Sequence, residues 1–98
     1  MTLTCVRLVA GEEIIGEVEE RDEGLLIENP AAIHIIPNES MGKTQMRFGL
    51  LPWLPYSADK KFGIPWDKVI TCHSPNIDLT NNYNSMFGSG IQIAQSFK

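Results

Sequence analysis

The amino-acid sequence predicts one small all-β domain, a strongly bent five-stranded barrel with a polar C-terminal extension. The chain has 98 residues, enough for one hydrophobic core but not for a second domain. Its β-branched and aromatic residues fall into short segments of period two, separated by turn-forming residues. Glycine and proline recur too often for a long window to sustain the 3.6-residue apolar period of a helix.

The first two strands are predicted at residues 4–9 and 13–20. The first alternates apolar side chains with the charged Arg7, as half-buried strands do. The second places glutamates on one face and apolar residues on the other. Because Gly16 would weaken a flat strand, we expect a sharp bend or a close backbone approach there.

The third strand is predicted to be bent or bulged. It starts at residues 25–28, after a charged turn at 21–24, and resumes over residues 31–36. Asn29 and Pro30 separate the two parts, and proline donates no hydrogen bond to a strand ladder.

The fourth and fifth strands are predicted at residues 44–53 and 67–73, with a proline-containing loop between them. The fourth is apolar, and few charges or prolines protect its edge. Such an edge promotes uncontrolled pairing, so we expect another element or another subunit to cover it.

Residues 1–74 are therefore assigned to the barrel and residues 75–98 to a C-terminal tail or arm. The second segment is rich in Asn, Ser, Gly and Gln, with isolated apolar side chains. We expect partial order there, because those side chains would otherwise lie in water.

Composition excludes several classes of protein. The net charge of −4 and the pI near 5.0 argue against a surface that attracts phosphate backbones indiscriminately. No apolar run approaches the roughly 20 residues that span a bilayer, so no membrane association is expected. The first residues do not resemble a signal peptide, which predicts a cytoplasmic location with Cys5 and Cys72 reduced.

One spacing resembles the first motif of the Sm-like family, which includes the Lsm and Hfq-type proteins. Gly11 follows the first strand, Gly16 comes five positions later, and Asp22 six positions after that. A looser similarity covers residues 64–70, so the resemblance extends over about residues 4–73. The long C-terminal tail is more similar to the divergent phage members than to the cellular ones.

The resemblance implies an SH3-like, Sm-like barrel and a homo-oligomeric ring of five to seven subunits. In such rings strand four of one subunit pairs with strand five of the next. The candidate interface residues are accordingly Met46, Phe48, Leu50, Val69, Ile70 and Thr71.

The base-recognition residues of the family are absent. Members that bind uridine-rich RNA carry an asparagine where this chain has Leu26, and an Arg-Gly pair where it has Pro65 and Trp66. The candidate RNA-binding residues here are Asp22, Leu26, Trp66, Asp67 and Lys68.

The aromatic side chains Trp53, Tyr56, Phe62 and Trp66 allow two interpretations. They form a core or a subunit interface, or they offer a base-stacking surface beside nearby lysines. The two interpretations are compatible when they concern different rings.

Two functional hypotheses follow. The first is a ring that binds single-stranded RNA, and the alternative is a ring that has lost the RNA site and serves as a protein-interaction or structural scaffold. Because no group of titratable residues forms a recognisable catalytic set, we expect neither an enzyme nor a cofactor. The adjacent Cys72 and His73 point to opposite faces of a strand, so no metal site is expected either.

Overall fold

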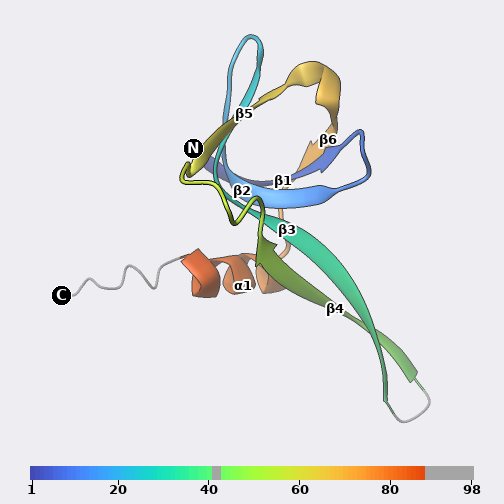
Figure 1. Cartoon of the computed structure of the whole chain (residues 1–98). Helices are drawn as coiled ribbons and strands as arrows, with labels where there is room; N and C mark the ends of the chain where they lie inside the picture. Colours follow the sequence, from blue (N-terminus) through green and yellow to red (C-terminus); the bar gives the residue numbers. More distant parts are fainter. Residues whose placement is uncertain (41–42, 88–98) are drawn as a thin grey trace, which may run out of the picture.

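The computed structural model describes residues 1–40 and 43–87, and these residues form a bent antiparallel sheet with one helix packed on it (Figure 1). The elements, in chain order, are β1 (Thr2–Leu8), β2 (Glu13–Glu20), β3 (Gly24–Ser40), β4 (Lys43–Pro52), β5 (Lys61–Pro65), the 3₁₀ turn η1 (Trp66–Lys68), β6 (Val69–His73) and α1 (Ile77–Phe87). No helix in the described part of the chain has the length and apolar character needed to cross a membrane.

The strands follow the order β4-β3-β2-β1-β6, and β5 pairs separately with β3. The first half of β3 pairs with β5 and its second half with β4, so β4 and β5 together occupy one side of the long strand. Within the described residues no pairing joins β6 to β4 or β5, and the sheet is not closed. The predicted all-β fold is confirmed, with the addition of the short strand β5 where a loop was expected.

The sheet bends where β2 crosses the middle of β3. The pairing register shifts between Ile15 and Glu17, and the facing residue Asn29 has a positive φ of 51°. Gly16 lies at this shift, where an added Cβ would approach Ile27 Cγ1 to 2.7 Å and the Glu28 carbonyl oxygen to 2.9 Å. The expected close backbone approach at Gly16 is therefore confirmed.

The hydrophobic core has two parts, one on each face of the sheet. The first fills the concave side and consists of Val6, Leu8, Ile14, Val18, Leu25, Ile27 and Ile64. The second lies between the sheet and α1 and consists of Cys5, Ile15, Ala31, Leu79 and Tyr83. Neighbouring residues such as Cys5 and Val6 are both buried because apolar groups cover both faces of β1.

Helix α1 lies in the segment that was expected to be a tail or arm. Asn76 begins it, because its Oδ1 accepts a hydrogen bond from the Leu79 backbone N–H at 2.9 Å. Tyr83 is buried on the inner face and its hydroxyl donates to the Asn29 carbonyl oxygen at 2.8 Å. The helix thus fastens to the bend of β3. Residues 88–98, the remainder of the expected tail, lie outside the described residues.

Candidate functional site

The β2–β3 turn and η1 come together although they are distant in sequence. The Trp66 indole Nε1 donates to the Arg21 carbonyl oxygen at 2.9 Å, across 45 positions of sequence. The Trp66 backbone N–H donates to the Glu23 carbonyl oxygen at 3.3 Å. The turn itself is closed by the Arg21 backbone N–H, which donates to the Gly24 carbonyl oxygen at 2.8 Å. The structure thereby places the turn that carries the exposed Asp22 against the 3₁₀ turn that starts at Trp66.

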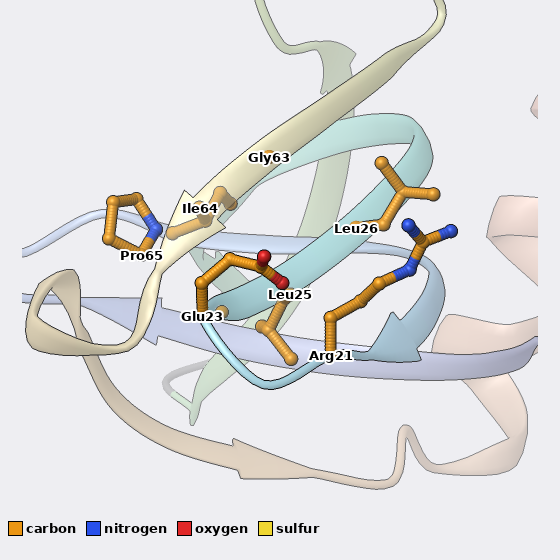
Figure 2. A pocket seen from close by; sticks show the side chains of 8 residues that line it. Arg21, Glu23, Leu25, Leu26, Gly63, Ile64 and Pro65 are labelled. Atoms are coloured by element: carbon orange, nitrogen blue, oxygen red, sulfur yellow. The ribbon is translucent and has the colours of Figure 1, made fainter.

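A pocket of about 360 Å³ adjoins this contact, between the start of β3 and β5 (Figure 2). Figure 2 shows Arg21 and Leu26 at one end of the pocket and Pro65 at the other. Leu26 is half-buried and contributes hydrocarbon to the wall. A leucine side chain has no polar group, so Leu26 offers no hydrogen bond to a base edge.

Charges of both signs surround the site. Asp22, Glu23 and Asp67 are exposed beside the basic Arg21 and Lys68. The Arg21 Nε lies 3.1 Å from the Glu19 carboxylate, which offsets part of its charge. The local balance is therefore not strongly basic, and electrostatics alone would not concentrate RNA there.

The aromatic residues divide into packed and accessible rings. Trp53 and Phe62 meet edge to face, with ring centroids 5.7 Å apart, and both pack against the concave core. Trp53 is also held by its Nε1, which donates to the Glu12 carboxylate at 3.2 Å. By contrast, Trp66 is 39% exposed and Tyr56 is 84% exposed. Of the four aromatic residues Trp53, Tyr56, Phe62 and Trp66, the last of these and Tyr56 are therefore the ones accessible to a base.

The candidate interface residues lie on β4 and β6, the two strands at opposite ends of the sheet. Leu50 packs toward α1 and Val69 toward the concave core, so each contributes to the hydrophobic core of the chain itself. Phe48, Ile70 and Thr71 are exposed on the edge strands, with Ile70 at 58%. Met46 pairs through its backbone with Pro37 of β3, and its side chain lies outside the description.

A polar cluster joins β6 to the neighbouring hairpin, and sequence analysis did not single it out. The His73 Nε2 lies 2.7 Å from Glu13 Oε2, and Arg7 approaches the same carboxylate at 3.8 Å. The hydrogen bond to Glu13 raises the pKa of His73, and a second one to the Ser74 carbonyl oxygen adds to this effect. Only the pairing of β1 with both β2 and β6 brings these residues together, so spacing along the chain contains no signal for them.

A second hollow, of about 200 Å³, lies between the β4–β5 connection and the end of α1. Phe87 contributes to its lining, and sequence analysis missed this role because it did not predict the helix. The available signal was the spacing of four apolar residues at i, i+4, i+7 and i+8, which are Leu79, Tyr83, Met86 and Phe87.

Comparison with protein-family models gives a match over most of the chain. A family model described as the Sm_like domain matches residues 5–84, from β1 into α1. Domains of this kind are generally oligomeric and bind RNA, and they generally act as binding modules rather than enzymes. A comparison with curated proteins found no match.

Proposed function

The chain belongs to the Sm-like family, and from this premise we propose that it is a non-enzymatic homo-oligomeric ring that binds single-stranded RNA. Five to seven subunits are expected by analogy with the family. The β2–β3 turn and η1 form the RNA site, and β4 and β6 form the contacts between subunits.

Assembly is supported by the two ends of the open sheet. Exposed apolar side chains lie on both edge strands, with Phe48 on β4 and Ile70 on β6. Unpaired strand edges are templates for association, and a stable protein covers them. Pairing β4 of one subunit with β6 of the next uses two different surfaces, which is a head-to-tail contact that closes into a ring when the rotation fits.

The observation that carries the RNA proposal is the attachment of Trp66 to the β2–β3 turn. Two hydrogen bonds, from its indole and from its backbone, fix the residue, while 39% of it stays accessible. A fixed, accessible ring stacks on a base at little conformational cost. Lys68, two residues further on and exposed, supplies a positive charge for a neighbouring phosphate.

Fluorescence anisotropy with short uridine-rich and adenine-rich RNA, across a range of salt, tests this proposal. We expect Trp66→Ala to weaken binding by about 1–3 kcal/mol, the usual contribution of one stacked base, while the assembly keeps its size. Ile77→Ala is the control, because Ile77 is also apolar and exposed, at 70%, but lies on α1. Equal affinity of the wild type and the Trp66 variant would remove Trp66 from the RNA site.

The scaffold alternative is favoured by the charges around the site, where the carboxylates outnumber the basic side chains by three to two. Exposed apolar residues on the β3–β4 hairpin, such as Ile35 and Phe48, are also suited to protein contacts. If the wild-type ring binds neither RNA at low salt, the scaffold becomes the better description.

A further inference from the structure

The connection between β4 and β5, residues 53–60, leaves the sheet as a large excursion, which we name the Tyr56 excursion. Pro52 pairs with Ala31 and Lys61 pairs with Glu28, so only two residues of β3 lie opposite the whole segment. It is the yellow-green connection that leads from β4 to β5 in Figure 1.

Both ends of the Tyr56 excursion are fixed to β3. The Trp53 backbone N–H donates to the Pro30 carbonyl oxygen at 3.1 Å, and the Asn29 backbone N–H donates to the Lys60 carbonyl oxygen at 2.8 Å. Inside the excursion the Ser57 backbone N–H donates to the Leu54 carbonyl oxygen at 3.1 Å, and Leu54 has a positive φ of 57°. Left-handed backbone at a leucine persists only where the surrounding structure enforces it, and such positions concentrate at functional sites.

The hollow beside the excursion has the character of a ligand site. Its volume is about 200 Å³, and three aromatic rings contribute to its lining, those of Trp53, Phe62 and Phe87. Asn29, Ser57, Asp59 and Lys60 add polar groups to the same wall. A hollow of this size that combines aromatic rings with a few polar groups is suited to one flat ring rather than to a larger ligand.

Tyr56 lies beside the hollow rather than in its lining. Its side chain is 84% exposed, the largest exposed fraction among the large hydrophobic residues of the described part of the chain. The ring is thus open to a partner, while the excursion that carries it is attached at both ends. Tyrosine in such a setting adds contact area at low entropic cost, because the side chain has only two rotatable bonds.

The stretch that carries Tyr56 has a small positive charge, which favours an anionic partner. Lys60 and Lys61 are the only adjacent basic residues in the sequence, and both are exposed. Asp59 is the one acidic residue among residues 53–61, so this stretch is positive although the chain has a net charge of −4. Aromatic faces beside lysines favour a ligand that combines flat bases with phosphates.

We propose that the Tyr56 excursion and its hollow are a second contact site for single-stranded RNA, with one base in the hollow and a neighbouring base stacked on Tyr56. This proposal rests on the RNA binding proposed above and extends it to a separate surface. The Tyr56 excursion comes before β5, and η1 comes after β5. Because the five residues of β5 span about 17 Å, a single RNA molecule reaches both sites only when it is several nucleotides long.

The affinity test compares substitutions that remove or keep the relevant chemistry. Tyr56→Ala is expected to weaken the binding of a long single-stranded RNA by about 5- to 150-fold, whereas Tyr56→Phe keeps the ring and the affinity. The double substitution Lys60→Ala and Lys61→Ala is expected to reduce the slope of log K against log salt by up to about 1.4, since each phosphate contact on a single strand contributes about 0.7. Replacing both lysines by arginine is expected to preserve the slope. If the alanine variants bind like the wild type, the proposal is overturned.

Crosslinking separates this proposal from the one on which it rests. Uridine-rich RNA that contains 4-thiouridine is irradiated on the wild-type protein, and tryptic peptides are analysed by mass spectrometry. The Tyr56 excursion belongs to the peptide 48–60 and Trp66 to the peptide 62–68. Crosslinks on both peptides support both sites.

The remaining crosslinking outcomes are also decisive. Phe62 lines the hollow but lies in the peptide 62–68, so the crosslinked residue is located within that peptide by fragmentation. Crosslinks only at residues 66–68 overturn the proposal of a second site and leave the first, whereas crosslinks only on 48–60 or at Phe62 do the reverse. A wild-type protein that binds no RNA in the anisotropy assay overturns both.

Discussion

Gly16→Ala is expected to destabilise the protein by about 1–3 kcal/mol, because it overpacks the bend of the sheet. The new Cβ would lie 2.7 Å from Ile27 Cγ1 and 2.9 Å from the Glu28 carbonyl oxygen, closer than real Cβ atoms approach other heavy atoms. Ile27 is fully buried and Glu28 belongs to the β2–β3 ladder, so neither neighbour moves without disturbing the core or the pairing. The entropy that alanine removes from the unfolded chain, roughly 0.4–1 kcal/mol, offsets only part of this cost.

Urea unfolding followed by circular dichroism measures the effect. All variants are compared at one protein concentration, since the stability of an oligomer depends on it. Gly63→Ala is the matched control, because Gly63 also lies in a strand but nothing approaches its would-be Cβ within 4 Å. The control is expected to be neutral or slightly stabilising. An unchanged free energy of unfolding for Gly16→Ala would refute the close approach at the bend.

Three further predictions concern α1, the cysteines and the polar cluster on β6. Tyr83→Phe removes the hydroxyl that donates to the Asn29 carbonyl oxygen, so the free energy of unfolding measured by urea titration is expected to fall by about 0.5–1.5 kcal/mol. An unchanged free energy of unfolding would contradict the role of this hydrogen bond in attaching α1 to the sheet. A thiol reagent is expected to modify the exposed Cys72 in the native protein and Cys5 only after unfolding, because Cys5 is buried and its burial raises its pKa to about 11. Fewer than two free thiols after denaturation without reductant would indicate a disulfide. The contact with Glu13 raises the pKa of His73, which means that protonated His73 stabilises the folded protein. This contribution to the free energy of unfolding is complete below about pH 6.5, the pKa of a free histidine, and is lost as the pH rises through the raised pKa. Thermal unfolding across this range is expected to show the decline, and a His73→Gln variant with the same pH dependence would exclude His73 as its source.

Much of the sheet could be predicted because its signals are local. The second strand was predicted at residues 13–20 and lies there, since glutamates and isoleucines define its pattern within a short window. The bend at Gly16 and Asn29 followed from the known limits of glycine and proline in strands. The pattern did not explain why Ile15 is fully buried, which results from α1 covering the face that was expected to be wet.

The elements that sequence analysis missed depend on tertiary contacts. Strand β5 has only five residues, one of them Gly63, and it is stabilised by pairing with the distant first half of β3. The contact of Trp66 with Arg21 similarly requires the sheet to bend before the two turns meet. Helix α1 contained a readable apolar spacing, but asparagine and serine between those positions favoured an interpretation as a polar tail.

The absolute mass of the native assembly, measured by light scattering behind a sizing column, tests the proposed ring most directly. We expect one species of five to seven times the 11.0 kDa chain mass. Ile70→Asp, which puts a charge on the exposed edge of β6, is expected to dissociate this species, whereas Ile77→Asp on α1 leaves it intact. A wild-type protein that elutes as a stable 11.0 kDa monomer at micromolar concentration would contradict assembly through β4 and β6.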